Sequence, residues 1–284
     1  MNKKTRLATW IKLGIKSIRS LDCEHSSSIY ALASSYLDRP KSWLLSHPHL
    51  LLSEKDEEYL NSHLARLKSG EPLAYITGLR SFFGLDFIVT PEVLIPRPET
   101  ELLVEQAILS SQDLDYPLSI ADVGTGSGCV AISLTKSIPR VQLIATDISF
   151  QALLIAKMNI QLHKTKNFIS LVQANLLEGI DKKFHVICGN LPYIPSKKLK
   201  NLSVVNYEPR ISLDGGKNGL YFICQLLKDI QKKLHDGGKL ILEIESGQRS
   251  DILKICEKYL PSASCRIIED LAGLPRVAVI KFNS

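Results

Sequence analysis

The chain has 284 residues, of which 45% are hydrophobic and 23% are charged, and it carries a net charge of +6. This composition excludes a largely disordered chain and is ordinary for a globular protein. The basic excess leaves room for a nucleic-acid partner, but it lacks the dense stripe of a dedicated nucleic-acid domain. No apolar run reaches the length of a membrane span, so we expect no membrane partner. The six cysteines show no Cys-x-x-Cys pair or zinc-finger spacing, which favours a reducing cytoplasm and no metal.

Residues 1–77 predict helices and no strands. Apolar residues recur at helical spacing over 7–21 and again over 29–37. Ser53 is a candidate cap for a third helix because Asp56 follows three positions later. The apolar face of that helix would comprise Leu60, Leu64 and Leu67. We therefore expect a small helical bundle as a separate N-terminal domain.

The character of the sequence changes at Gly78. Residues 82–90 predict a short β-hairpin with its turn at Gly84-Leu85. Prolines at 91, 96 and 98 then interrupt regular structure, so residues 78–97 are expected to form a linker. The second domain, 98–284, should open with a helix over 99–109, since Pro98 suits the first turn of a helix.

Strand-like and helix-like runs alternate from residue 118 onward, which predicts a parallel sheet with helices on both faces. The last two strands, 265–268 and 277–282, are separated by a loop too short for a helix, so they should pair antiparallel. The resulting α/β architecture resembles the Rossmann-like fold of class I S-adenosylmethionine-dependent methyltransferases. The other expected strands are 118–123, 141–146, 169–173, 184–188 and 239–244, and the expected helices are 129–137, 149–162, 219–235 and 248–260.

Three glycines, at 124, 126 and 128, follow the first of these strands and open a helix. Glycines let the backbone approach a ligand closely, and a helix N-terminus favours a negative group. Asp147 ends the second strand about 20 residues later, where a carboxylate can hold a ribose hydroxyl pair. The alternative is a tight strand–helix turn in which Asp147 only caps the next helix. Strand context and Asp147 together favour a nucleoside cofactor, although Cys129 departs from the dinucleotide fingerprint.

The segment Asn190-Leu191-Pro192-Tyr193 follows the fourth strand, at the edge where such sheets bind ligands. The side-chain oxygen of Asn190 and the backbone carbonyl of Leu191 offer two acceptors for a planar –NH2 group, and Pro192 stiffens the loop. Tyr193 is expected to lie against the flat amide or base. Such positioning contributes roughly 7–11 kcal/mol to barrier reduction. With the glycine turn, this loop predicts group transfer to an amide or aromatic amine nitrogen. The alternative is an ordinary proline-containing turn.

Motifs between residues 71 and 276 resemble those of the protein-(glutamine-N5) methyltransferases of peptide release factors, the PrmC or HemK family. The helical domain and the hairpin linker match that family in layout. Besides the glycine turn and Asn190-Leu-Pro-Tyr193, the matching stretches are Glu71-Pro-Leu-Ala-Tyr-Ile-Thr-Gly78, Leu94-Ile-Pro-Arg-Pro-Glu-Thr-Glu101, Tyr207-Glu-Pro-Arg210, Leu213-Asp-Gly-Gly216 and Asp270-Leu-Ala-Gly-Leu-Pro-Arg276.

The resemblance implies methylation, from S-adenosylmethionine, of the glutamine in the Gly-Gly-Gln motif of class I peptide chain release factors. It implies a cytoplasmic monomer that needs no direct nucleic-acid contact, with residues 1–77 gripping another part of the release factor. Residues 95–98 and Glu208-Pro209 would shape the mouth of the site. The residues implied in catalysis are Asn190, Leu191, Pro192 and Tyr193, and those implied in cofactor binding are Gly124, Thr125, Gly126, Ser127, Gly128, Asp147, Asn175, Leu176 and Asn190.

Two segments depart from the family pattern. Leu191 stands where the family has the first proline of Asn-Pro-Pro-Tyr, but the backbone carbonyl is retained, so we expect activity from a less rigid loop. Asn175-Leu176 stands where the family has an Asp-aromatic pair. The Asn175 oxygen can still accept a hydrogen bond from the adenine amine, with weaker binding expected.

Three alternatives remain at the level of sequence. An adenine-N6 nucleic-acid methyltransferase also grips an amine with an Asn-x-Pro-Tyr loop, after base flipping. A ribosomal-protein glutamine methyltransferase is closely related but normally has a different linker. A non-catalytic module could use Lys197, Lys198 and Lys200 to hold nucleic acid, although such a run most simply forms a solvated face.

Overall fold

The computed structural model describes residues 5–18, 25–112, 114 and 117–282. The chain divides into two compact units, residues 1–79 and 80–284. Leu21 and Cys23, which the sequence patterns include, lie outside the described residues. Across the described ranges, no helix is both long enough and apolar enough to cross a membrane.

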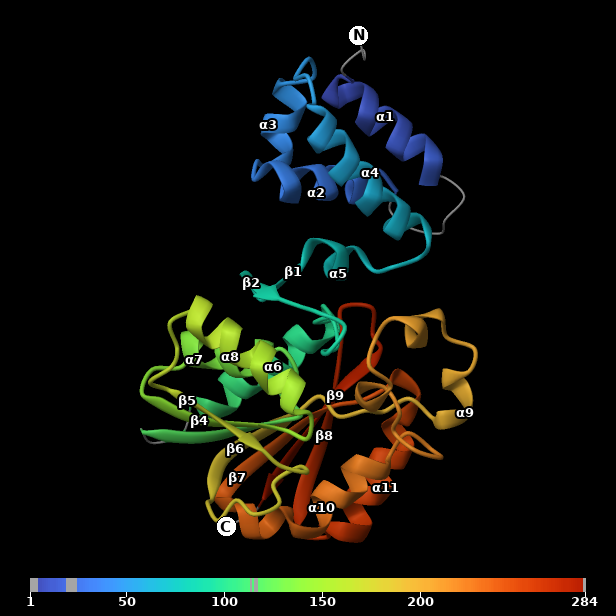
Figure 1. Cartoon of the computed structure of the whole chain (residues 1–284). Coiled ribbons are helices and arrows are strands. Elements are labelled where there is room, and N and C mark those ends of the chain that lie inside the picture. Colours follow the sequence, from blue (N-terminus) through green and yellow to red (C-terminus); the bar gives the residue numbers. More distant parts are fainter. Residues whose placement is uncertain (1–4, 19–24, 113, 115–116, 283–284) are drawn as a thin grey trace. The chain divides into compact units, whose positions relative to one another are not determined.

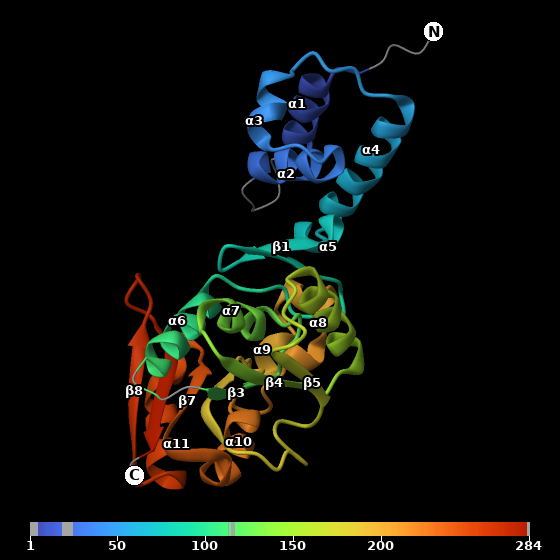
Figure 2. The ribbon, with the colours of Figure 1, turned by 90° about the vertical axis from the view of Figure 1, so that its left-hand side faces the viewer.

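The first unit is the expected helical bundle. Helix α2 (His25–Leu37) contacts α1 (Leu7–Ile18), α3 (Lys41–Ser46), α4 (Glu54–Lys68) and α5 (Leu73–Thr77) (Figure 2). Ser53 caps α4 as predicted: its Oγ accepts from Asp56 N at 3.2 Å, and Ser53 N donates to Asp56 Oδ2 at 2.7 Å. Helices α3 and α5 were not foreseen as separate elements, because each is too short for a periodic pattern and follows a proline, Pro40 or Pro72.

The predicted hairpin is present, but the position expected for its turn is wrong by one residue. Strands β1 (Leu79–Phe82) and β2 (Leu85–Ile88) are joined at Phe83-Gly84 rather than at Gly84-Leu85. Both turn residues have positive φ, 49° and 72°. A two-residue turn with this geometry follows the twist of the strands, and that requirement overrides the usual avoidance of positive φ by phenylalanine.

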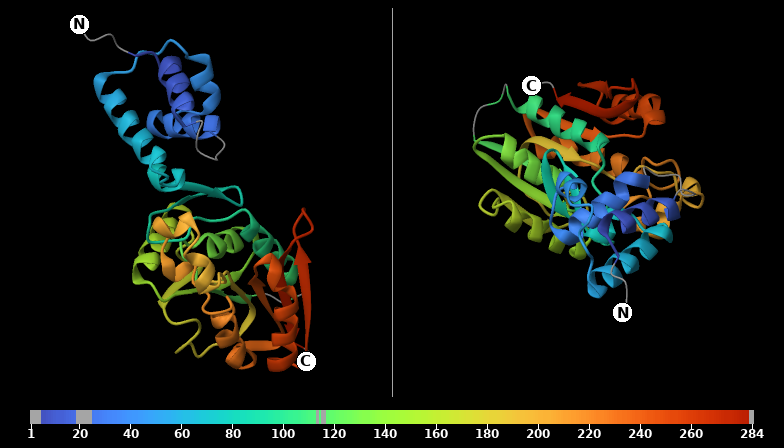
Figure 3. Two further views of the ribbon diagram at one scale, coloured as in Figure 1. Left: turned by 90° about the vertical axis from the view of Figure 1, so that its right-hand side faces the viewer. Right: turned by 90° about the horizontal axis from the view of Figure 1, so that it is seen from above.

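The second unit is built on a seven-stranded sheet in the order β5-β4-β3-β6-β7-β9-β8. The five strands from β3 to β7 pair in parallel, β9 pairs antiparallel with β7, and β8 pairs antiparallel with β9 at one edge (Figure 3, red). This topology confirms the predicted parallel sheet closed by an antiparallel hairpin. The strands are β3 (Leu118–Val123), β4 (Val141–Asp147), β5 (Ile169–Gln173), β6 (Phe184–Gly189), β7 (Leu234–Glu243), β8 (Ala263–Glu269) and β9 (Pro275–Phe282).

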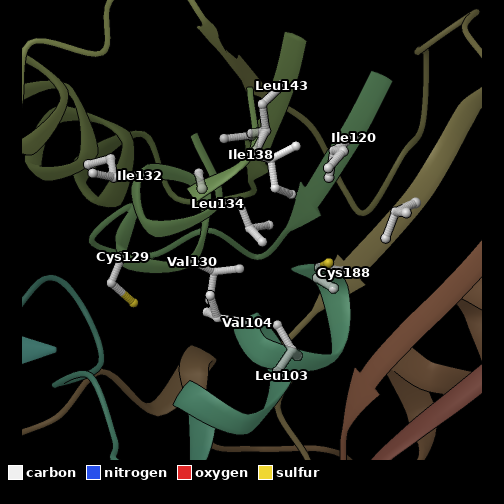
Figure 4. Packing of buried hydrophobic residues seen from close by; sticks show 14 of the residues in the cluster. Leu103, Val104, Ile120, Cys129, Val130, Ile132, Leu134, Ile138, Leu143 and Cys188 are labelled. Carbon is white, nitrogen blue, oxygen red and sulfur yellow. The ribbon is translucent and has the colours of Figure 1, made fainter. Parts of the chain in front are cut away.

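Helices cover both faces of this sheet (Figure 1). One buried cluster joins the sheet to α6 (Glu99–Ser111), α7 (Cys129–Ser137) and α8 (Phe150–Leu162), and it includes Cys129 and Cys188 (Figure 4). The opposite cluster joins the sheet to α10 (Tyr221–Lys233) and α11 (Arg249–Tyr259). The short helices α9 (Ser196–Leu199), η1 (Ser203–Asn206), η2 (Arg210–Ser212) and η3 (Ser246–Gln248) complete the unit.

The register of the sheet determines which loops meet. Val123 at the end of β3 pairs with Thr146 of β4 and with Gly189 of β6. Gly189 in turn pairs with Leu242 near the end of β7. The carboxyl ends of these parallel strands therefore lie at one edge, which brings the glycine turn, Asp147 and the segment after Gly189 together.

Candidate active site

A pocket lies at the carboxyl edge of the parallel strands. One wall is formed by Glu92, Val93, Leu94, Pro96, Arg97 and Thr100, and another by Pro209, Ile211, Ser212 and Phe222. Gly128 and Tyr193, both predicted site residues, are not part of its lining. The predicted residues that do line it are Gly124, Thr125, Gly126, Ser127, Asp147, Asn175, Leu176, Asn190, Leu191 and Pro192.

The glycine turn is locked by a buried carboxylate. All three glycines adopt positive φ. Asp122 Oδ2 accepts from Thr125 Oγ1 at 2.6 Å and from Ala131 N at 3.2 Å, which ties the turn to the first turn of α7. Burial raises the pKa of Asp122 to about 6. Sequence reasoning did not give Asp122 a role, although its place directly before the glycines was the available signal.

Gly128 has a packing role rather than a place on the pocket wall. A Cβ built at this position would lie 3.3 Å from Ala156 Cβ, so the missing side chain lets α7 and α8 approach closely. Its φ of 81° adds a second reason for glycine.

Asp147 supports the glycine turn as well as facing the pocket. Its Oδ2 accepts from Gly126 N at 2.9 Å, and its Oδ1 accepts from Ser149 N at 2.9 Å. The helix cap itself is Ser149, whose Oγ accepts from Ala152 N at 3.1 Å. Burial raises the Asp147 pKa, while these backbone donors lower it. Each carboxylate oxygen retains a lone pair, so the group can still accept hydroxyl protons from a ligand.

Leu176 adopts a conformation that leucine rarely takes. Its φ is 54°, and Thr146 Oγ1 donates to its backbone oxygen at 2.8 Å, which holds the residue in place. Asn175 beside it is exposed and lines the same pocket. Backbone strain of this kind concentrates at ligand-binding positions, so the segment after β5 is shaped for the pocket.

The Asn190–Tyr193 segment is tied to three different parts of the second unit. Asn190 Nδ2 donates to Thr100 Oγ1 at 3.0 Å, at the start of α6. The Tyr193 hydroxyl donates to Glu243 Oε1 at 3.1 Å, at the end of β7. Gln248 Nε2 donates to the backbone oxygen of Tyr193 at 3.2 Å. Because Asn190 uses its amino group internally, its Oδ1 is left as the acceptor.

Leu191 packs its side chain into the cluster beneath α10 and is only 3% exposed. The Leu191 side chain also lies 3.5 Å from a Cβ built on Gly124, so the loop and the glycine turn are in contact. Burial of Leu191 therefore provides an anchor at the position where the family pattern has a proline.

An ion pair between the half-exposed Arg97 and the buried Glu208 links two walls of the pocket. Arg97 Nη2 lies 2.6 Å from Glu208 Oε1 and 2.7 Å from Oε2. Burial raises the pKa of Glu208, and the positive charge of Arg97 offsets only part of this rise. Pro209 and Ile211, which follow Glu208, line the same pocket as Arg97. The two segments expected to shape the mouth of the site are thus connected directly.

The segment 213–219 supports the Asn190–Tyr193 loop from behind. Ile194 N donates to Leu213 O at 3.1 Å, and Gly215 N donates to Ile194 O at 2.9 Å. A Cβ at Gly219 would lie 2.1 Å from the backbone oxygen of Tyr193. Only glycine fits at this contact, which explains Gly219.

The pocket residues suit a nucleoside cofactor with a charged amino-acid end. Asp147 can accept hydroxyl protons, and the exposed Asn175 offers both a donor and an acceptor. Ser127 Oγ is buried without a hydrogen-bond partner among the described residues, beside the N-terminus of α7. A ligand carboxylate there would accept a hydrogen bond from the Ser127 hydroxyl and would be stabilised by the positive end of the helix dipole. Within the described ranges, no group of three His, Cys, Asp or Glu side chains could hold a metal ion.

The sheet order, the closing antiparallel hairpin and the glycine turn define a class I S-adenosylmethionine-dependent methyltransferase fold. The methyltransferase small domain family matches residues 100–206. A crystal structure of a methyltransferase from Pyrococcus furiosus shares the fold, with a TM-score of 0.53 and 21% identity over 79% of this chain and 99% of the other.

Proteins similar in sequence define a narrower family than the fold does. A release factor glutamine methyltransferase from Coxiella burnetii is 37% identical, with 88% of this chain and 89% of the relative covered. One from Geobacter sulfurreducens is also 37% identical, with 75% and 74% covered. The PrmC N-terminal domain family matches residues 22–78. The chain belongs to the family of release factor glutamine methyltransferases.

Proposed function

We propose that this protein transfers a methyl group from S-adenosylmethionine to the side-chain amide nitrogen of the glutamine in the Gly-Gly-Gln motif of class I peptide chain release factors. The observation that carries the proposal is the fixed amide of Asn190. Its Nδ2 is held by Thr100, so its Oδ1 remains free to accept at the pocket that the glycine turn also lines.

S-adenosylmethionine, when bound, supplies a methyl group activated by a positively charged sulfur. Asp147 would accept the ribose hydroxyl protons, and Gly124 to Gly128 would hold the amino-acid end at the N-terminus of α7. Asn175 would accept from the adenine amine through its side-chain oxygen, with Leu176 beside it. Asn190 would border the cofactor as well as the substrate.

The substrate amide would donate one N–H to Asn190 Oδ1 and the other to the backbone carbonyl of Leu191. Pro192 limits the freedom of the loop, and Tyr193 is tied to Glu243, so the two acceptors keep their direction. The substrate nitrogen would take the methyl group as the methyl–sulfur bond breaks, and the methylated nitrogen would then release one proton to water. No residue has to act as a base before the transfer.

Residues 1–77 would form the domain that recognises a second part of the release factor, residues 78–97 the linker, and residues 98–284 the catalytic domain. We propose a monomer that acts in the cytoplasm, where release factors work. Lys198, one of the three lysines after the active-site loop, donates to Glu245 at 2.9 Å.

The test is methyl transfer from labelled S-adenosylmethionine to a purified class I release factor. A release factor with alanine in place of the motif glutamine and a double-stranded DNA serve as controls. We expect label on the wild-type factor alone, and its loss with Asn190→Ala. Label on DNA, or equal label on both factors, would show that the acceptor is an adenine or a different protein site.

A further inference from the structure

Phe222 contributes the one aromatic ring among the described residues that line the pocket. It is the second residue of α10, and its side chain is half-buried. The neighbouring Tyr221 meets the Phe222 ring edge-on, with 5.1 Å between the ring centres. Tyr221 is 57% exposed and does not line the pocket. The pocket therefore offers one aromatic face to a ligand, and Phe222 provides it.

Contacts along α10 place Phe222 beside the segment that follows β5. At the end of the helix, Lys233 Nζ donates to the backbone oxygen of Ile180. Along its length, α10 and the segment after β5 line a common groove. At the start of the helix, Phe222 borders both this groove and the pocket, as Asn175 and Leu176 also do. These three residues therefore lie together where the groove adjoins the pocket.

The order of the strands indicates where the base of the cofactor would lie. Strands β3, β4 and β5 are neighbours in the sheet, and the glycine turn, Asp147 and Asn175 lie at their carboxyl ends in that order. In the proposed function, the glycine turn holds the amino-acid end and Asp147 holds the ribose. The base and the amino-acid part are attached to opposite ends of the ribose, so the base would lie beyond β4, beside Asn175 and Phe222.

We propose that Phe222 binds the adenine base of S-adenosylmethionine by stacking against one of its faces. A base carries its hydrogen-bonding groups at its edge, so a contact with Asn175 leaves the two flat faces to be covered. An aromatic ring stabilises such a face through dispersion and the exclusion of water. Leu176 has no ring and cannot stack in this way. This inference rests on the proposed use of S-adenosylmethionine.

The packing of α10 fixes the Phe222 ring before a ligand binds. Ile223 and Leu226 are buried in the cluster beneath the helix, and Phe222 packs at the edge of the same cluster. A side chain that is already ordered loses little conformational entropy on binding, so more of the stacking free energy contributes to affinity. We therefore expect the ring to affect binding of the cofactor more than it affects the fold.

Calorimetric titration with S-adenosylhomocysteine tests the proposal. This compound is the cofactor without its methyl group, and it keeps the base, the ribose and the amino-acid end. Phe222→Leu retains an apolar side chain but removes the ring, so Kd should rise about tenfold, which corresponds to about 1.4 kcal/mol of stacking. Phe222→Tyr retains the ring and should stay within about threefold of wild type. Tyr221→Ala is the matched control and should leave Kd unchanged.

Phe222→Trp provides a spectroscopic readout of the same contact. An indole that stacks on adenine loses fluorescence, so saturation with S-adenosylhomocysteine should quench this variant more than it quenches wild type. The wild-type protein, whose tryptophans are Trp10 and Trp43, gives the baseline. Tyr221→Trp places an indole one residue further along, outside the pocket, and should show no added quenching.

The proposed function and the role of Phe222 fail in different ways. If the wild-type protein neither binds S-adenosylhomocysteine nor labels the release factor, the proposed function fails. If wild type binds, but Phe222→Leu keeps Kd within about threefold of it, the ring does not hold the base. Absence of added quenching in saturated Phe222→Trp would overturn the proposal as well. So would an equal loss of affinity in Tyr221→Ala, because the start of α10 as a whole would then support the pocket.

Discussion

The ion pair between Arg97 and Glu208 offers a quantitative test of how the pocket walls are held. The Glu208 side chain is 1% exposed and the Arg97 side chain 35%, so Arg97→Ala leaves a buried carboxylate without its partner. Removing one member of a buried pair typically costs about 3–5 kcal/mol. Because water already reaches part of Arg97, we expect a loss near the low end, about 3 kcal/mol in the free energy of unfolding.

The stability lost through Arg97→Ala should depend on pH. The pKa of Glu208 is already raised by burial, and removing Arg97 raises it further. A carboxyl whose folded pKa lies above its unfolded value stabilises the fold at low pH and loses that contribution as pH rises through the folded pKa. Arg97→Ala should therefore be more damaging at about pH 8 than at about pH 5.

Urea unfolding at both pH values measures these differences. Lys198→Ala is the control, because the pair between Lys198 and Glu245 is exposed on both sides, at 60% and 33%, and such pairs contribute about 0–1 kcal/mol. The double variant Arg97→Met/Glu208→Leu should recover most of the stability, since no charge is then left buried. If Arg97→Ala costs no more than Lys198→Ala, the ion pair does not hold the walls together and the reasoning is refuted.

Three further outcomes are expected. Gly219→Ala should abolish turnover, because the added Cβ would lie 2.1 Å from the backbone oxygen of Tyr193. Gly237 has a similar φ and no atom within 4 Å of its added Cβ, so Gly237→Ala should cost only about 1–3 kcal/mol of stability. If the two variants have equal effects, the clash is not the cause. The pKa of Glu243 is raised to about 7, so the carboxyl stabilises the fold at low pH and loses that contribution as it ionises. In urea unfolding, the stability of wild type relative to Glu243→Gln should therefore fall by on the order of 3 kcal/mol between about pH 4.5 and 7. A stability difference that stays constant over this range would contradict the prediction. Asp147→Ala should raise the Kd for S-adenosylmethionine at least about tenfold by calorimetric titration, because charged hydrogen bonds are each worth about 1.5–3 kcal/mol; an unchanged Kd would remove Asp147 from the cofactor site.

The sequence was sufficient to predict the sheet because its central strands, such as β3 and β6, are buried on both faces and consist of largely apolar runs. The turn after β3 could also be predicted, because its glycines at 124, 126 and 128, which all adopt positive φ, recur at every second position in the sequence. The hairpin turn was misplaced by one residue, because nothing local marks Phe83 as a residue that adopts a φ of 49°.

The supporting residues of the site could not be predicted. Thr100 and Asn190 are 90 positions apart, and Tyr193 and Glu243 are 50 apart, so only the folded sheet brings each pair within hydrogen-bond distance. In the sequence, Glu243 is one acidic residue near the end of an expected strand, with no further feature that marks it. Its burial depends on the packing of α6 and β9 around β7, which no local pattern encodes.

The most direct test of the central claim is to identify the atom that receives the methyl group. After reaction with wild-type protein, peptide mapping of the release factor by fragment mass spectrometry should place one methyl on the side-chain nitrogen of the Gly-Gly-Gln glutamine. Asn190→Ala should leave that peptide unmodified. A methyl group on any other residue of the release factor, or modification that persists with Asn190→Ala, would contradict the assignment of the Asn190 loop as the amide site.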